Sequence, residues 1–163
     1  LVMIILSLDL SLNRTGWAVL DTEKRQKKSR ILDYGVINNK HLTSKHTGRK
    51  LYHIELYLKA LLIEYNPDII IVEELTGSAF TDTSQLAKVH GILEKLTMKF
   101  ENIFYINNKK FKAEFTGNGN SKKDEVEAKV LEYIPNLLFR YDDESDAVGF
   151  LIYYTMKEGI CKW

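Results

Sequence analysis

The sequence predicts an α/β fold in which a mixed five-stranded sheet is flanked by helices. Short apolar runs alternate with longer stretches in which apolar residues recur at helical spacing. The first three runs are joined by short polar connections, a pattern typical of an antiparallel three-stranded meander. Each later run follows a helical stretch, a pattern typical of parallel β-α-β units. We therefore expect a meander joined to two parallel strands.

The first three predicted strands lie within residues 3–38. Residues 3–10 form an apolar run that only Ser7 and Asp9 interrupt, which predicts a buried strand. Asn-Arg-Thr-Gly at 13–16 predicts a turn, and the apolar residues at 16–20 predict a second strand. Residues 21–29 are a polar connection. Alternation over 30–38 then predicts a third strand.

The middle of the chain predicts a helix followed by a central strand. Apolar residues at helical spacing over 47–65 indicate an amphipathic helix, which Asn66 and Pro67 end. The continuous apolar run over 69–73 indicates a strand that is buried on both faces, as in a parallel sheet.

The second half predicts helices around one short strand. In order, we expect a helix over 83–99, a strand over 103–106, a basic glycine-containing loop over 107–120, a helix from about Ser121 to Tyr133, and a last helix over 143–157. Ser121 and Asp124 resemble the capping box that opens a helix.

The composition is that of a soluble globular protein, and we expect one domain spanning residues 1–163. Cys161 is the single cysteine, so a disulfide framework is excluded and a thiolate zinc site is not expected. No apolar run approaches the roughly 20 residues of a membrane span. The apolar start lacks the basic segment of a signal peptide. We therefore expect a cytoplasmic protein.

Four carboxylates stand where the predicted strands and the last helix end or begin: Asp9, Glu73, Asp143 and Asp146. Asp9 and Glu73 lie at the ends of buried strands, where a charge is costly without a partner. Asp143 and Asp146 are three residues apart and share one helix face. Acids in a first helical turn also favour the helix dipole, so a purely structural role is the alternative for this pair.

Like charges gathered at one site repel each other unless a cation or a proton offsets them. Carboxylate oxygens without thiolates or imidazoles favour Mg²⁺, with Mn²⁺ able to substitute. Two such ions suit in-line phosphoryl transfer. Glu74 follows Glu73 on a strand and points to the opposite face, so only one of the two can enter a shared site.

Charge is segregated along the chain. Residues 24–50 carry nine Lys and Arg against one acid, whereas residues 124–146 carry eight acids against two basic residues. Basic stretches beside an acidic centre suit a polyanion held over a metal site. Solvated lysine-rich loops are the plainer interpretation of the same pattern.

Four segments resemble, in order, the motifs of RuvC-type Holliday junction resolvases. They are Ile5-Leu6-Ser7-Leu8-Asp9-Leu10-Ser11 with Thr15-Gly16-Trp17-Ala18-Val19, then Ile71-Val72-Glu73-Glu74, then Gly117 to Val126, and Asp143-Glu144-Ser145-Asp146-Ala147-Val148. Each motif is short, but together they span nearly the whole chain.

The resemblance implies an RNase H-like fold, a homodimer, and Mg²⁺-dependent nicking of four-way DNA junctions. It implies that Asp9, Glu73, Asp143 and Asp146 are catalytic and hold the metal. It also implies that Lys112 and Lys123 contact DNA. In the family the helix after the second motif helps to form the dimer, which here is residues 83–99 with Gly91 permitting close packing.

The chain departs from the family pattern in three places. Leu10-Ser11 replaces the usual Pro-Gly, Glu74 replaces a Gln, and Thr76 stands where an aromatic residue helps to open the junction. We therefore expect a divergent member of phage type that also nicks three-way and flap DNA. A non-catalytic branched-DNA-binding module and a nuclease for another nucleic acid stay open as alternatives. The first motif also resembles actin-like ATPases, but the chain is too short for their second domain.

Overall fold

The computed structural model describes residues 2–76 and 80–163, without the side chains of Ser44 and residues 80–83. Its elements are β1 (Ile4–Asp9), β2 (Arg14–Asp21), α1 (Lys27–Arg30), β3 (Ile31–Asn38), the 3₁₀ turn η1 (Ser44–His46), α2 (Thr47–Tyr65), β4 (Ile69–Glu73), α3 (Phe80–Leu96), β5 (Ile103–Ile106), α4 (Asn108–Thr116), α5 (Lys123–Tyr133) and α6 (Asp142–Lys157). In these described ranges, no helix is both long and apolar enough to cross a membrane.

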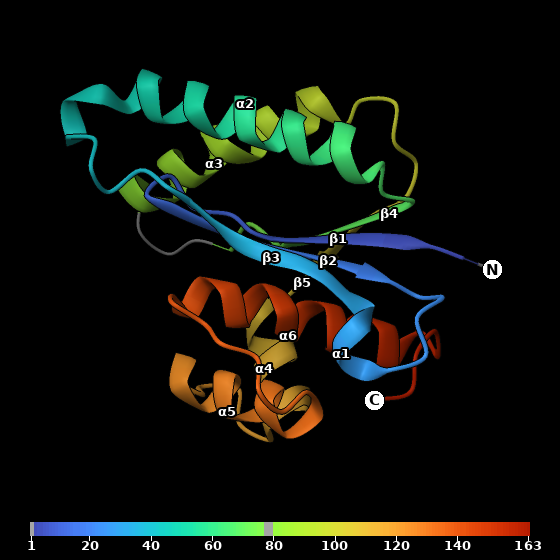
Figure 1. Ribbon diagram of the computed structural model, residues 1–163. Helices are drawn as coiled ribbons and strands as arrows, with labels where there is room; N and C mark the ends of the chain where they lie inside the picture. Colours follow the sequence, from blue (N-terminus) through green and yellow to red (C-terminus); the bar gives the residue numbers. More distant parts are fainter. Residues whose placement is uncertain (1, 77–79) are drawn as a thin grey trace.

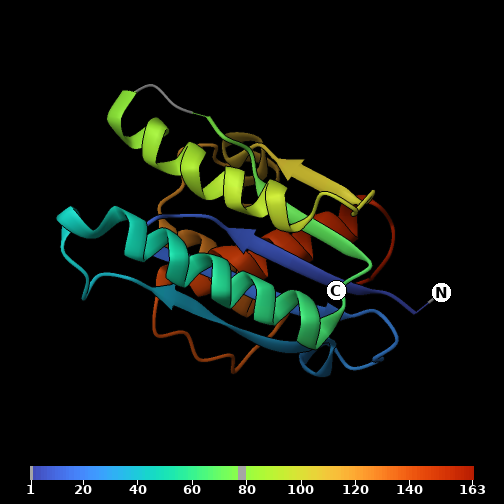
Figure 2. The same cartoon turned by 90° about the horizontal axis from the view of Figure 1, so that it is seen from above.

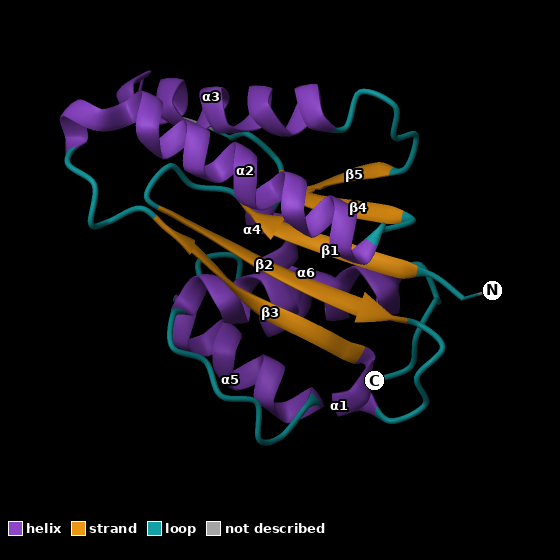
Figure 3. Ribbon diagram, turned by 45° about the horizontal axis from the view of Figure 1, so that its top comes forward, coloured by secondary structure: helices purple, strands orange, loops and turns teal. Residues whose placement is uncertain are grey.

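The five strands form one mixed sheet in the order β3-β2-β1-β4-β5 (Figure 3). β1 pairs antiparallel with β2, and β2 pairs antiparallel with β3. β4 lies parallel to β1 on one side and to β5 on the other. The prediction of a meander joined to parallel strands is confirmed. This topology sends the carboxyl ends of β1, β4 and β5 to the same edge of the sheet.

Helices cover both faces of the sheet. α2 and α3 lie side by side over one face, and α4, α5 and α6 lie under the other (Figures 1 and 2). Alternation along β1 divides the core accordingly, because Leu6 and Leu8 belong to the cluster under α2 and α3 whereas Ile5 belongs to the cluster around α6. Asp9 follows the alternation of Ile5 and Ser7 and so faces α6.

The expected basic loop over 107–120 is largely the helix α4, so that prediction is wrong for 108–116. Asn107 caps this helix by accepting a hydrogen bond from the Lys110 backbone at 3.1 Å. Phe111 and Phe115 lie one turn apart and are buried against the rest of the core. Gly117 ends the helix with a φ of 87°, a backbone conformation that glycine adopts without strain.

Smaller differences concern helix and strand ends. Arg14 opens β2 instead of lying in a turn, and a short helix α1 occupies part of the polar connection at 21–29. The helix predicted over 83–99 is shifted by three residues towards the N-terminus. The helix α5 begins after Lys122, whose backbone N–H bonds to Glu125 at 2.6 Å, so the predicted capping box at Ser121 is wrong.

Candidate active site

Two acids meet at the carboxyl edge of the sheet. Leu8 of β1 pairs with Val72 of β4 in parallel register, so the next residues, Asp9 and Glu73, end neighbouring strands. Both continue the alternation that faces α6, and the negative charge of Glu73 acts on Asp9. The sheet therefore supplies one pair of carboxylates to this edge.

The first turn of α6 supplies the second pair. Asp143 and Asp146 are each only 7% exposed, although they lie at the start of a helix. Ser7 of β1 is fully buried and donates from its Oγ to the Ala147 carbonyl oxygen at 2.6 Å. This bond ties the helix to the strand that carries Asp9, so the two pairs of acids share one site.

Gly16 of β2 allows this close approach. A Cβ built on Gly16 would overlap the backbone carbonyl of Asp143 and lie 2.5 Å from its carbon. Carbon atoms in van der Waals contact lie about 3.5–4.0 Å apart. The glycine of the first motif is therefore required for the position of α6 against the sheet.

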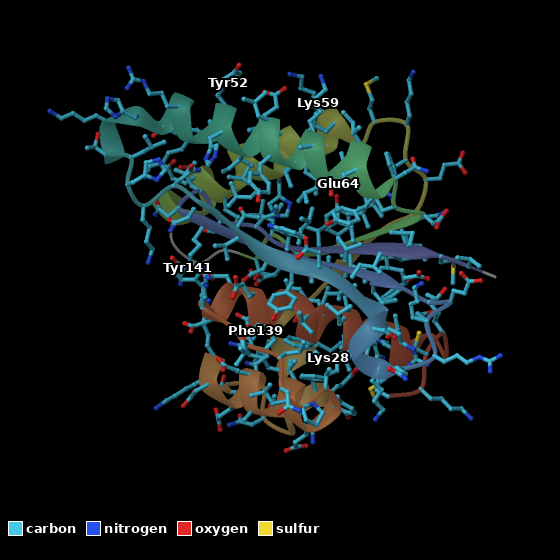
Figure 4. All side chains as sticks on the ribbon, in the orientation of Figure 1. Lys28, Tyr52, Lys59, Glu64, Phe139 and Tyr141 are labelled. Carbon is cyan, nitrogen blue, oxygen red and sulfur yellow. The ribbon has the colours of Figure 1, made fainter. Side chains whose placement is uncertain are left out.

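Two cations neutralise Asp143. The Arg14 guanidinium bonds to its Oδ2, and the Lys123 ammonium bonds to its Oδ1 at 2.8 Å. Burial opposes ionisation, yet these two hydrogen bonds hold the pKa of Asp143 below its usual value. Arg14 also lies 4.6 Å from the ring centre of Tyr141, which lies beside the start of α6 (Figure 4). Asp143 is thus an anchored, ionised acid.

The negative charges of Asp146 and Asp9 are less fully neutralised than that of Asp143. Burial, followed by the charges of Glu73 and Asp146, raises the pKa of Asp9 well above its usual value. Burial also raises the pKa of Asp146 to about 6, although Lys123 and Lys112 act to lower it. Asp146 Oδ1 is buried and finds no hydrogen-bond partner among the described residues. An orphaned carboxylate oxygen beside two further acids is a feature that a divalent cation would satisfy.

Lys123 and Lys112 lie beside these acids. The Lys123 ammonium is 3.5 Å from Asp146 Oδ2, and Lys112 of α4 acts on the charge of Asp146. Burial acts to lower the pKa of Lys123, but the Asp143 bond and the charges of Asp146 and Asp9 raise it above its usual value. Both lysines named by the sequence therefore lie at the acids rather than on a distant surface.

Neighbouring acids have separate partners. Asn108 donates to Glu73 Oε1 at 2.7 Å, whereas Asn107 donates to the exposed Glu74 at 3.1 Å. Glu144 accepts backbone hydrogen bonds at the start of α6, from Arg140 at 2.7 Å among others, and so caps its own helix. Glu74 and Glu144 therefore make hydrogen bonds of their own, apart from those of the four acids.

The acids are of the chemical type that binds a divalent metal ion, but their side chains are not gathered around one point. Across residues 2–76 and 80–163, no three His, Cys, Asp or Glu side chains are grouped closely enough to hold an ion. Instead, the Lys123 ammonium supplies positive charge between Asp143 and Asp146. The donor set consists of oxygens alone and Asp146 Oδ1 is open, so the residues suit Mg²⁺ or Mn²⁺.

Three contributors escaped the sequence interpretation: Arg14, Asn108 and Ser7. Arg14 was expected in a turn, and Asn108 in a loop. Both residues lie just beyond the carboxyl end of a strand, at the edge where ligands gather in such sheets. This position is the sequence feature that could have identified them. Ser7 interrupts an apolar strand two residues before Asp9, but nothing in the sequence names its partner on α6.

A mixed sheet in this strand order, with acids on β1, β4 and the last helix, defines the class of RNase H-like nucleases. The family model described as "Crossover junction endodeoxyribonuclease RuvC" matches residues 5–153. The chain belongs to this family. At the family level its activity is that of a Holliday junction resolvase, an endonuclease for crossover junctions in DNA.

Relatives with the same description occur in several bacteria. The chain is 28% identical over 159 residues to the RuvC of Prochlorococcus marinus, covering 95% of this chain and 98% of the relative. It is 29% identical over 160 residues to that of Rickettsia massiliae, covering 94% and 96%. The similarity therefore extends over the full length of these relatives. A phage-type origin stays a prediction.

Solved structures share the fold. Thermus thermophilus RuvC in complex with Holliday junction substrate superposes with a TM-score of 0.78 at 17% identity, covering 98% of both chains. Fowlpox virus resolvase, solved with substrate Holliday junction DNA, gives a TM-score of 0.59 at 17% identity, covering 96% of this chain and 99% of that one. Both are proteins that bind a four-way junction.

Proposed function

We propose that this chain nicks Holliday junctions and other branched DNA by metal-dependent phosphodiester hydrolysis, with Asp9, Glu73, Asp143 and Asp146 as the catalytic carboxylates. The observation that carries the proposal is the buried, unpartnered Oδ1 of Asp146 beside the raised-pKa Asp9. Carboxylates that are buried close together despite their mutual repulsion are typical of functional sites. A module that only binds DNA would gain nothing from them.

Asp9, Glu73 and Asp146 would hold Mg²⁺, and Asp143 would join them from the same turn of α6. When bound, such ions supply the Lewis acidity that in-line hydrolysis of a phosphodiester requires. Asn108 fixes the carboxylate of Glu73 through its 2.7 Å hydrogen bond. Arg14 fixes Asp143 in the same way. These two contacts orient the acids before DNA arrives.

Lys123 and Lys112 would bring the scissile phosphate to the acids. The side chain of Lys123 is 44% exposed, so its ammonium is accessible to DNA. It can release Asp143 and bind a phosphate oxygen instead. Lys112 lies on α4, close enough to act on the charge of Asp146. Positive charge on the phosphate side of an acidic site lowers the repulsion that the acids exert on DNA.

A homodimer would supply the two active sites that a two-fold symmetric junction needs. We place its interface on the outer face of α3, around Gly91. Gly91 is exposed, and among the described residues no heavy atom lies within 4 Å of a Cβ built there. Packing within the monomer therefore does not explain this glycine, which costs about 1 kcal/mol of helix propensity relative to alanine.

The dimer is tested by replacing Gly91 with arginine. The open surroundings should leave the monomer folded, while the bulky cation should separate the two copies. Sedimentation of wild type and Gly91→Arg at working concentration measures this. A wild-type chain that stays monomeric even on junction DNA would refute the dimer.

Selectivity is expected to be broad. Thr76 is exposed and has no aromatic ring to wedge into the junction centre. We expect branched DNA to be preferred over duplex, with three-way and flap substrates also nicked.

The deciding experiment is cleavage of four-way, three-way, flap and duplex DNA with Mg²⁺, with Mn²⁺ and with EDTA. We expect no cleavage in EDTA and none by Asp9→Asn, while junction binding persists. Glu74→Gln is the matched control and should cleave normally. If Asp9→Asn cleaves fully in Mg²⁺, the site assignment fails; if duplex is cut as well as junction, the resolvase function fails.

A further inference from the structure

Lys50 is a buried cation that the active site does not use. It is 6% exposed and lies in the first turn of α2. Its ammonium donates to Asn13 Oδ1 at 2.6 Å, and no carboxylate of the described residues lies within 4.0 Å of it. Burial without a counter-charge destabilises a cation, and the first turn of a helix disfavours positive charge. Buried lysines are seldom left without an ion pair, so Lys50 is a candidate for binding an anion.

A cavity gives this cation access to a ligand. The cavity has a volume of about 400 Å³, and its lining includes Ser11, Asn13, Thr47, Lys50 and Gln85. It lies between the loop after β1, the first turn of α2 and the second turn of α3. A phosphodiester group, which is no larger than a few water molecules, fits this volume.

The walls of the cavity are held in place by a polar network around Asn39. The side-chain nitrogen of Asn39, which is fully buried, donates to the backbone oxygens of Leu12 and Lys50, each at 3.1 Å. Its side-chain oxygen lies 2.5 Å from His53 Nδ1. The loop after β1 and the start of α2 are thus joined, so Lys50 is pre-positioned rather than free to leave the cavity.

The surroundings of the cavity favour an anion. No Asp or Glu occurs between Asp33 and Glu55 in the sequence, a stretch that includes Lys40, Lys45 and Arg49. These three residues are exposed. A cluster of one sign beside a low-dielectric cavity strengthens the local field. The later part of the basic segment that the sequence singled out, residues 40–50, therefore includes the cation that lines this cavity.

The position of the cavity relates it to DNA. Asn13 lies four residues after Asp9, in the loop at the carboxyl end of β1. The starts of α2 and α6 lie at the same end of the sheet, on opposite faces (Figure 1). A strand that places one phosphate at the acids under the sheet can therefore continue past this edge towards α2.

We infer that Lys50 and the cavity around Asn13 form a second phosphate-binding site, which holds a backbone phosphate of a junction arm away from the cleavage point. This inference rests on the proposed function, because it takes DNA as the source of the phosphate. Asn13 orients the ammonium, and Lys40, Lys45 and Arg49 raise the local concentration of DNA.

The test measures binding of a fluorescent four-way junction in EDTA between 50 and 200 mM KCl. Each phosphate contact contributes about 0.9 to the slope of log affinity against log salt. Lys50→Gln should lower that slope by about 0.9, which makes its loss of affinity over this range roughly 3.5-fold smaller than that of wild type. Lys50→Arg should restore the slope. Lys59→Gln is the control, because Lys59 points away from the sheet on the same helix (Figure 4).

Asn13→Asp covers the case in which Lys50→Gln does not fold. The new carboxylate pairs with the ammonium, so the variant should melt no lower than wild type while its salt slope falls. Asn66→Asp adds the same charge at the other end of α2 and should leave the slope unchanged. A purely structural Lys50 would leave all slopes equal, and that result overturns the inference.

Adding inorganic phosphate at millimolar concentration shows whether the site binds a phosphate of DNA or a free phosphate ion. If phosphate raises the melting temperature of wild type but not of Lys50→Gln, while the DNA slopes are equal, the site takes free phosphate and the DNA contact is wrong. Equal slopes with normal junction binding by wild type overturn only this inference. Wild type that fails to distinguish junction from duplex overturns the proposed function itself.

Discussion

Replacement of Gly16 with alanine tests how the last helix is placed against the sheet. The new Cβ would lie 2.5 Å from the carbonyl carbon of Asp143, about 1 Å inside van der Waals contact. The opposing atoms are helix backbone, so α6 must move away by about that distance. A displacement of 1 Å at a catalytic site can cost about 100-fold in rate. Overpacking of this kind also costs about 1–3 kcal/mol in stability.

Two measurements on one preparation decide this. Single-turnover cleavage of a four-way junction in Mg²⁺ should fall by about 100-fold, and the melting temperature should drop by several degrees, at about 2–4 °C per kcal/mol. Gly48→Ala is the control for stability, because its Cβ would meet no described atom within 4 Å, and it should not melt lower than wild type. A Gly16→Ala protein with wild-type melting and cleavage would refute the close approach of α6.

Three further outcomes follow from the site. In EDTA, stability should fall as pH rises from 4 to 7, because the raised pKa of Asp146, about 6, makes the folded chain bind more protons than the unfolded chain in this window. In denaturant titrations, Asp146→Asn should reduce the change in the free energy of unfolding between these pH values by about 3 kcal/mol. An unchanged pH profile would contradict the burial of this charge. Lys112→Ala and Lys123→Ala should slow cleavage of junction DNA, so a wild-type rate in Lys123→Ala would exclude its role at the phosphate. Ser7→Ala should lower the free energy of unfolding by about 1 kcal/mol through loss of its buried hydrogen bond to α6, whereas no change would show that the bond adds nothing.

Periodicity was sufficient to predict the sheet and most helices, because these elements follow local rules. The run over 69–73 is apolar throughout, and β4 is buried on both faces as that pattern indicates. Composition alone predicts a loop in place of the helix α4, because the segment is rich in lysine and is followed by glycines. Phe111 and Phe115 at one-turn spacing, with Asn107 as a cap, were the local signals that outweigh this composition.

The acids of the site were predictable because each interrupts an apolar element or lies at one end of it. Their partners were not, because pairing depends on distances that sequence spacing does not give. Arg14 and Lys123 reach Asp143 from β2 and α5, elements far apart in the chain. The pKa of Asp143 therefore lies below its usual value and that of Asp146 above it, although the two share one helix turn and one motif.

The hydrogen bond between Ser7 and Ala147 joins residues that are 140 positions apart in the chain. During synthesis, at roughly 5–20 residues per second, the strand that carries Asp9 therefore emerges on the order of ten seconds before the helix that carries Asp146. Throughout that interval this face of the sheet lacks α6, and Asp9 lacks the two acids that α6 supplies. A nascent or truncated chain without α6 thus lacks two of the four proposed catalytic acids, so we expect it not to cleave DNA before α6 is in place.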